Sequence, residues 1–177
     1  AMLKRDLPSA THLKLAFMSR YGKLSPGTAK TMVEGLPEGG RIRKDGKIVK
    51  VPPAYKVESI PFTEDLSATA VTIPWGDVAT AYYSTGIPNI EVYFASLPSL
   101  QAMLTATRYF GQVMGTGLMQ AWLKAHADML PEGPTPEERA GAQIVVVAEA
   151  EDARGHRAAA RMVTPEAYAC TGVLASA

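Results

Sequence analysis

A long stretch of the chain, from Leu66 to Thr107, contains only two charged residues, Asp77 and Glu91. In a globular protein, a segment this poor in charge belongs either to the buried centre of a domain or to an interface. The charges lie on either side of it. Residues 1–60 carry twelve of the 18 Lys and Arg residues and five acids, a net charge of +7, which leaves −6 for the rest of the chain. We therefore expect the middle of the chain to form the centre of the fold or a contact surface.

Alternating hydrophobic residues predict strands around this segment. In residues 11–18, Leu13, Leu15 and Phe17 face one side and more polar residues face the other, as in a half-buried strand. The expected elements are a strand at 11–18, a helix at 28–36, a hairpin at 41–49, strands at 56–62 and 68–73, a helix at 77–84, a strand at 89–95, helices from 98 to 129 with a break at 115–117, a loop at 131–136, a hairpin at 143–163 and a last helix. Because the strands lack regular helical crossovers, the pattern predicts an α+β fold with one mostly antiparallel or mixed sheet and helices largely on one face.

The chain length of 177 residues suits one domain. Residues 1–10 are interpreted as a lead-in, in which Ala1-Met2 resembles the remnant of an expression tag, and residues 11–177 as the single α+β domain. The chain contains no apolar run long enough to cross a membrane and does not open on a signal peptide, so we expect a cytoplasmic protein. A single Cys170 and three scattered histidines give no metal-ligand spacing, and no metal site is expected.

Several sequence signatures of function are absent. The chain contains no G-x-G-x-x-G, no phosphate-binding G-x-x-x-x-G-K-[ST] and no G-x-S-x-G nucleophile elbow. The hairpin at residues 41–50 is basic, but it contains no aromatic residue on which nucleic-acid bases could stack. We therefore expect no cofactor site in this chain and no nucleic-acid partner, and we assign no catalytic residue.

Polar-tipped aromatic residues cluster within the uncharged middle segment. Trp75, Tyr82 and Tyr83 lie close to Asp77, at the start of a predicted helix. Aromatic walls with a few polar groups are typical of small-molecule pockets, and the helix start would present free backbone N–H groups. The same pattern also fits core aromatics beside a helix-capping aspartate, and a buried Trp75 would cost about 3–5 kcal/mol on truncation to alanine. Both interpretations stay open at this point.

A second helix start lies at residues 25–28. Ser25 followed by proline is typical of an N-cap, and Gly27 and Thr28 complete a small-residue turn. Such a helix end can bind a carboxylate or a phosphate, although an N-cap without a ligand is the commoner case. With Trp75, Asp77, Tyr82 and Tyr83, these three residues form the candidate substrate-binding set.

Longer motifs extend this pattern over most of the chain after residue 10. They are Ile73–Tyr82 with Ser84–Tyr93, Ser25–Ala29, Gly39–Gly46 and Thr164–Tyr168. In these motifs the chain resembles saccharopine dehydrogenase-like oxidoreductases, a group that includes the trans-acting enoyl reductases. The resemblance implies an N-terminal Rossmann domain for NAD or NADP and a second α+β domain for substrate binding and dimerisation.

This chain matches only the second of those domains. The resemblance therefore implies the substrate-binding and dimerisation domain of an NAD(P)-dependent oxidoreductase, inactive as a fragment, with its own Rossmann domain, a second copy and a small-molecule substrate as partners. The alternative is a free-standing, non-enzymatic module that binds an apolar small ligand or a protein partner. The same aromatic segment and the missing cofactor motif favour that alternative.

Overall fold

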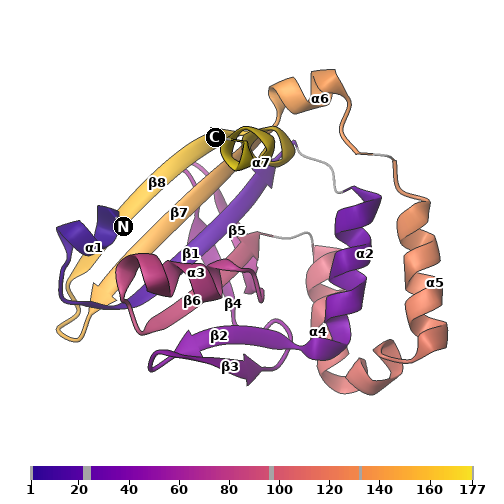
Figure 1. Cartoon of the computed structure of the whole chain (residues 1–177), viewed down its shortest axis with the longest axis horizontal. Helices are drawn as coiled ribbons and strands as arrows, with labels where there is room; N and C mark the ends of the chain where they lie inside the picture. The colour runs from indigo at the N-terminus through magenta and orange to yellow at the C-terminus, as the bar shows by residue number, and fades with distance from the viewer. Residues whose placement is uncertain (1, 22–24, 96–97, 132, 177) are drawn as a thin grey trace.

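A computed structural model describes residues 2–21, 25–95, 98–131 and 133–176. Strands and helices are interleaved along the chain, as Figure 1 shows. The elements are α1 (Met2–Asp6), β1 (Ala10–Arg20), α2 (Pro26–Gly35), η1 (Leu36–Glu38), β2 (Gly40–Lys44), β3 (Lys47–Val51), β4 (Val57–Pro61), β5 (Ser67–Thr72), α3 (Asp77–Thr85), β6 (Asn89–Ala95), α4 (Pro98–Met114), α5 (Gly117–Asp128), α6 (Pro136–Gly141), β7 (Gln143–Asp152), β8 (Arg157–Pro165) and α7 (Ala167–Ala175).

All eight strands belong to one mixed sheet. Its main path runs β3-β2-β6-β1-β7-β8, and the β4–β5 hairpin joins through pairing of β5 with β6. Strands β1 and β6 run parallel, with Leu13 opposite Ile90, and every other pairing is antiparallel. This confirms the predicted α+β class with a mixed sheet.

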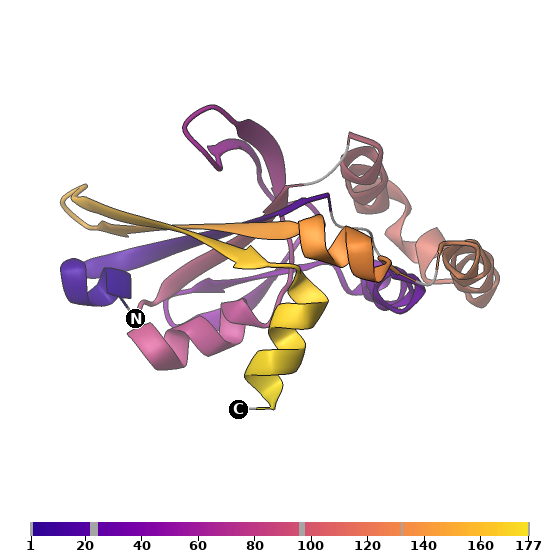
Figure 2. The ribbon, with the colours of Figure 1, turned by 90° about the horizontal axis from the view of Figure 1, so that it is seen from above.

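The helices gather on one face of the sheet and beside one of its ends. Figure 2 views the sheet along its edge, with α1, α3 and α7 on one side and the β4–β5 hairpin arching over the other. Helices α2, α4 and α5 lie beside the sheet. The expectation that helices lie largely on one face is confirmed, and the opposite face is left to the hairpin and to solvent.

The two faces of β1 are packed differently. Leu13 lies in a buried cluster with Val78 of α3 and with Ile90 and Val92 of β6. On the opposite face, Ala16 and Met18 lie in a second cluster under the β4–β5 hairpin. On the same side of the strand, His12 and Lys14 belong to neither cluster, and Lys14 Nζ lies 5.4 Å from the centroid of the Tyr93 ring at the cluster's edge. The face opposite α3 is therefore apolar at one end and polar at the other.

The uncharged middle segment does supply the centre of the sheet. Within β6, Ile90, Val92 and Tyr93 are fully buried, and β5 adds Ala70 and Val71. The end of the same segment enters α4, which lies beside the sheet rather than in its core. The segment thus forms the buried centre of the fold, one of the two roles that its composition allowed.

Local sequence accounts for most element boundaries. Ser25 caps α2 with Pro26 in its first turn. Asp45 and Gly46 take φ values of 49° and 76° in the β2–β3 turn, as a type I′ hairpin requires. The predicted break at residues 115–117 separates α4 from α5.

Three elements differ from the expectation. Helix α1 packs its buried Leu3 into the main core, so residues 2–10 contribute to the domain instead of only leading into it; Ala1 lies outside the described residues. Helix α6 forms where the sequence suggested the end of a loop, because Thr135 and Glu138 make a reciprocal capping box. Strand β8 runs two residues past the expected hairpin, to Pro165. Glu166 then caps α7, because its carboxylate accepts from the backbone N–H groups of Tyr168 and Ala169.

Candidate functional site

The polar end of the sheet face opposite α3 forms a cavity of about 470 Å³. Strands β1, β2, β4, β6, β7 and β8 and the segment before β4 contribute its lining residues: His12, Leu13, Lys14, Ile42, Arg43, Lys44, Tyr55, Lys56, Glu58, Asn89, Glu91, Glu149, Glu151 and Arg157. Two of these turn their side chains to the other face, Leu13 into the core and Arg43 onto the carbonyl of Val78 in α3. The remaining charged side chains comprise four acids and four bases.

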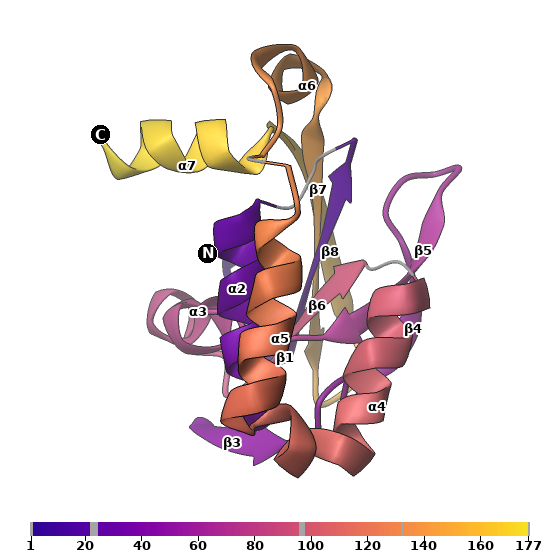
Figure 3. The same ribbon diagram turned by 90° about the vertical axis from the view of Figure 1, so that its right-hand side faces the viewer.

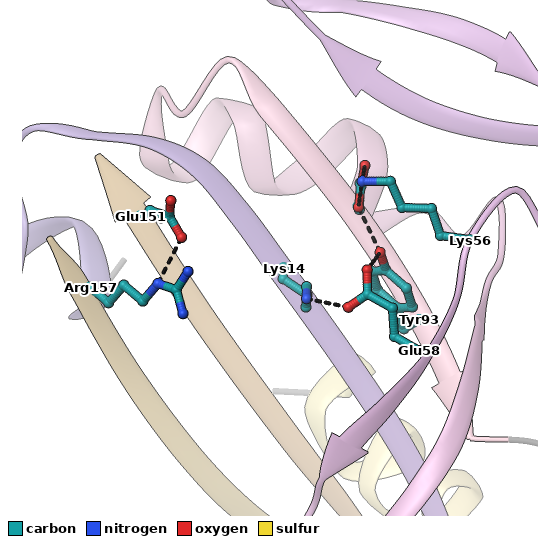
Figure 4. Close-up of polar contacts among 7 residues, drawn as sticks. Lys14, Lys56, Glu58, Tyr93, Glu151 and Arg157 are labelled. Atoms are coloured by element: carbon teal, nitrogen blue, oxygen red, sulfur yellow. Dashed lines mark hydrogen bonds and ion pairs between the residues drawn. The ribbon is translucent and has the colours of Figure 1, made fainter. Parts of the chain in front are cut away.

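Three ion pairs connect the strands that line the cavity. Lys14 Nζ lies 2.5 Å from Glu58 Oε2, Lys56 Nζ lies 2.7 Å from Glu91 Oε1, and Arg157 Nε donates to Glu151 Oε2 at 2.8 Å. Figure 4 shows Glu58 between Lys14 and Tyr93, with the Glu151–Arg157 pair separate from them on β7 and β8. The Lys14–Glu58 pair ties the β4–β5 hairpin to the central strand and so closes one side of the cavity.

The hydroxyl of Tyr93 links two of these ion pairs, Lys14–Glu58 and Lys56–Glu91. Its fully buried side chain places the hydroxyl 2.7 Å from Glu91 Oε2 and 3.0 Å from Glu58 Oε1. A phenol carries one proton, so it donates to one carboxylate at a time. Burial, reinforced by both carboxylates, raises the pKa of Tyr93 and keeps the phenol neutral.

The paired groups are held in their charged forms. Burial alone would raise the pKa of Glu58, but hydrogen bonds from Lys14 and Tyr93 outweigh it and hold that pKa below its usual value. Burial likewise opposes the charge on Lys56, but the hydrogen bond to Glu91 together with the nearby negative charges of Glu91 and Glu58 outweighs burial and raises the Lys56 pKa. The result is a chain of fixed charges from Lys14 through Tyr93 to Lys56.

Two charged side chains of the cavity have no such partner. Among the residues that the structure describes, the side chains of Glu149 on β7 and Lys44 on β2 make no hydrogen bond or ion pair. Glu149 sits opposite Lys14 in the strand register, but Lys14 is already engaged by Glu58. The cavity therefore offers one free anion and one free cation beside a network that is internally satisfied.

Arg108 positions the segment that carries Tyr55 and Lys56. Its guanidinium donates from Nε to the carbonyl of Pro53 at 2.8 Å and also donates to the carbonyl of Ala54. Beyond Ala54, the backbone N–H of Lys56 donates to the Thr72 hydroxyl at 3.0 Å. Helix α4 and strand β5 thus fix this wall of the cavity.

A second, smaller cavity of about 300 Å³ lies at the β7–β8 turn. There the buried Asp152 accepts from the hydroxyl of Ser9 and from the backbone N–H groups of Arg154 and His156. The hydrogen bond from the His156 ring is the largest cause that holds the pKa of Asp152 well below its usual range, and the Ser9 hydroxyl and the two backbone N–H groups add to it. Every contact here serves to close the turn, and we assign it a structural role.

The first group of sequence-predicted site residues lies away from the main cavity. The Ser25 hydroxyl accepts from the backbone N–H of Thr28 at 3.2 Å, which is an ordinary N-cap. The Tyr168 hydroxyl from α7 then contacts both hydroxyls, at 2.9 Å from Ser25 and 2.8 Å from Thr28. Gly27 is exposed beside them. The structure brings these three together, with α7 beside the helix start.

The second group lies on the α3 side of the sheet. Trp75 packs against Phe17 and Phe94, with ring centroids 5.0 and 5.6 Å away, and remains 44% exposed. Asp77 is in the first turn of α3, and Tyr82 lies over the Arg43 guanidinium at 4.3 Å. Tyr83 points to solvent. These residues share α3 and its approach, but they line neither cavity.

The sequence left open whether Trp75 is a core residue or part of a pocket wall. In the structure its ring packs on two phenylalanines and is also partly exposed to solvent, so it is only half-buried. It therefore forms the exposed edge of an aromatic cluster on the helix-covered face.

The sequence reasoning missed the charged cavity itself. Its residues alternate in the strands: His12 and Lys14 in β1, Glu149 and Glu151 in β7, and Glu91 in β6. Charged residues at every second position of adjacent strands were the available signal, since they share one face of a sheet. What the alternation could not reveal is that β4 curls back to place Glu58 above that face.

Within the described residues, no group of three His, Cys, Asp or Glu side chains is placed to hold a metal ion. The described helices include none with the length and apolar character needed to span a membrane.

No family model matches the chain, and no curated protein matches it. Among solved structures, it is similar to the apo histidine-tagged saccharopine dehydrogenase (L-Glu forming) from Saccharomyces cerevisiae, with a TM-score of 0.44 and 9% sequence identity. The similarity covers 88% of this chain and 53% of that one, so the chain spans about half the length of that enzyme. A similarity at this level assigns neither a family nor an activity, and the resemblance to the enoyl reductase group stays a prediction.

Proposed function

We propose that this domain binds a small polar molecule carrying both a positive and a negative group, in the cavity on the open face of the sheet. The observation that carries the proposal is the unpartnered pair, Glu149 and Lys44, beside a satisfied network of ion pairs. A volume of about 470 Å³ is within the range of small-molecule sites.

The chemistry of recognition follows from charge. A ligand ammonium would bind the Glu149 carboxylate, and a ligand carboxylate would bind the Lys44 ammonium. The network around Tyr93 would stay intact and hold the strands at a fixed spacing, so that little side-chain ordering is lost on binding. A ligand with only one charge would satisfy one of the two groups.

In this proposal the chain is the substrate-binding and dimerisation domain of a saccharopine dehydrogenase-like, NAD(P)-dependent oxidoreductase. The motifs around residues 73–93 support that assignment. The chain has no glycine fingerprint for a dinucleotide, so NAD or NADP would be held by a Rossmann domain outside it, and no step of hydride transfer is assigned to its residues. The domain alone would bind substrate without turning it over.

Calorimetric titration with three related probes tests the binding proposal. Lys44 on β2 and Glu149 on β7 lie three strand spacings apart, roughly 15 Å between backbones, so the probe must carry its charges at opposite ends. 6-Aminohexanoate carries both charges, hexanoate lacks the cation and hexylamine lacks the anion. We expect 6-aminohexanoate to bind at least about tenfold more tightly than either single-charge probe. Glu149→Gln should remove this preference, whereas Glu64→Gln, on the exposed β4–β5 turn, should not. Equal or undetectable binding of all three probes would contradict the proposal.

The aromatic cluster on the other face supports a second candidate function. Trp75 exposes 44% of its surface next to Phe17 and Phe94, a surface suited to an apolar ligand or a protein partner. This is the free-standing binding module. In a Trp122→Phe background, quenching or a blue shift of Trp75 fluorescence by an apolar probe such as 1-anilinonaphthalene-8-sulfonate, with no response to 6-aminohexanoate, would favour it.

A further inference from the structure

On helices α4 and α5, the charged side chains contact the domain and the large apolar side chains are exposed, the reverse of an ordinary surface helix. The two helices contain three charged residues, Arg108, Lys124 and Asp128. In an ordinary surface helix, charged residues face water and apolar residues face the protein. Here all three charges are used in contacts with the body of the same domain.

The contacts of those charges are specific. Arg108 donates to the backbone carbonyls of Pro53 and Ala54. Lys124 Nζ lies 2.7 Å from Glu34 Oε1, and Asp128 pairs with Lys30, both across the contact between α5 and α2. In Figure 1, α2 lies between α5 and the sheet, so these ion pairs join α5 to the body of the domain.

The outward side of the pair is apolar. Leu118, Trp122 and Met129 recur along one side of α5, and Tyr109, Phe110 and Val113 lie in the last turns of α4, each between 50% and 85% exposed. We call these six residues the α4–α5 face. Figure 3 looks at this side of the molecule, with α5 in front of α2 and α4 next to it.

The size of this face matches one half of a stable protein interface. Large side chains present roughly 150–250 Å² each when fully exposed. At the observed exposures, the six leave on the order of 800 Å² of surface, close to the area of about 800 Å² per partner in standard interfaces. Trp, Tyr, Phe and Met are also the residues enriched at the centres of interfaces.

We propose that the α4–α5 face is covered by the same face of a second copy of this chain. In a two-fold interface the patch faces itself, so a charge near the axis meets its own copy and any other charge needs an opposite charge within the same patch. A patch without charged side chains meets that condition. Its lack of lysine and arginine also distinguishes it from helices that lie on lipid, which carry basic residues along their polar side. The inference deepens the dimerisation part of the proposed function and is independent of the ligand cavity.

The test is the oligomeric state of the full chain, measured by light scattering on a sizing column between about 1 and 200 μM. We expect a dimer that dissociates on dilution, and Leu118→Arg or Trp122→Arg variants that dimerise at least about 100-fold more weakly. Ile48→Arg on β3 replaces another exposed apolar residue and is the matched control, expected to behave as the unaltered chain. Far-UV circular dichroism verifies that each variant is folded.

A fluorescence measurement gives the same answer without an arginine substitution. In a Trp75→Phe background the emission comes from Trp122, since the chain has two tryptophans, and dilution should shift it to the red as the interface opens. A chain that is monomeric at 200 μM, with no such shift, would overturn the proposal and the dimerisation part of the function. A dimer unaffected by Leu118→Arg and Trp122→Arg would refute the assigned surface alone. If the fluorescence of Trp122 instead reports binding to anionic or neutral lipid vesicles, the α4–α5 face contacts a membrane and the proposal of a second copy is wrong. In every case the 6-aminohexanoate titration stands separately.

Discussion

Replacing Tyr93 by phenylalanine removes one hydroxyl from the centre of the charge network and leaves the ring in the core. The hydroxyl lies within hydrogen-bond distance of Glu58 and Glu91, but its single proton satisfies one of them at a time. A hydrogen bond to a charged group contributes about 1.5–3 kcal/mol. Because each carboxylate keeps its lysine, we expect Tyr93→Phe to lower the free energy of unfolding by about 2 kcal/mol, with a Tm lower by about 4–8 °C.

Urea unfolding at neutral pH, followed by circular dichroism, measures this loss. The slope of the free energy against urea should stay unchanged, because the same surface is exposed on unfolding. Tyr168→Phe is the matched control: it removes an exposed hydroxyl that contacts Ser25 and Thr28, and we expect a loss below about 0.5 kcal/mol. A loss from Tyr93→Phe no larger than that of the control would refute the network as a stabilising element.

Three further predictions follow from the geometry. Trp75→Ala should cost about 2 kcal/mol in urea unfolding, below the 3–5 kcal/mol of a buried aromatic, because almost half of the ring is already exposed; a loss above about 4 kcal/mol would contradict the observed packing. Arg43→Met should cost about 2–4 kcal/mol, because it strands the carbonyls of Val78 and Gly46 that the guanidinium now binds; an Arg43→Met chain as stable as the unaltered one would show that these bonds contribute nothing. The free energy of unfolding should fall above about pH 10, because the pKa values of Lys56 and Tyr93 are both raised in the folded state. Their contribution is complete below their pKa values in the unfolded chain, about 10–10.4, and is lost as the pH rises through their pKa values in the folded state. A urea midpoint unchanged between pH 9 and pH 11 would contradict this last prediction.

The acid limb of the pH profile has the opposite sign. The pKa of Glu58 is lowered in the fold, so its contribution is present above the unfolded value of about 4.3 and is lost as the pH falls through the folded value. Tyr93→Phe removes one of the donors that lower this pKa. The variant should therefore begin to lose the contribution of Glu58 at a higher pH than the unaltered chain.

The sequence predicts the elements of this fold better than it predicts their arrangement. Alternation in β1, the N-cap at Ser25 and the turn at Asp45-Gly46 are local signals, and each appears in the structure where the pattern placed it. The parallel pairing of β1 with β6 joins residues far apart in the chain, and no local signal encodes it. The capping box of α6 was readable in Thr135 and Glu138, but the surrounding prolines favoured a loop.

The candidate site was harder to predict for the same reason. Aromatic residues near a helix start pointed to Trp75 and Asp77, which lie on the covered face of the sheet. The cavity instead gathers charged residues from strands that are distant in sequence, and it depends on a hairpin that curls back over the sheet. Single charged residues on separate strands indicate a solvated face until the pairing of those strands is known.

The most direct test of the central claim is an amide chemical-shift map of the domain during titration with 6-aminohexanoate. The account predicts shifts centred on Lys44 and Glu149, extending to His12 and Asn89 on the same face. Shifts centred on Trp75 and Tyr83, or no shifts at millimolar probe, would contradict it.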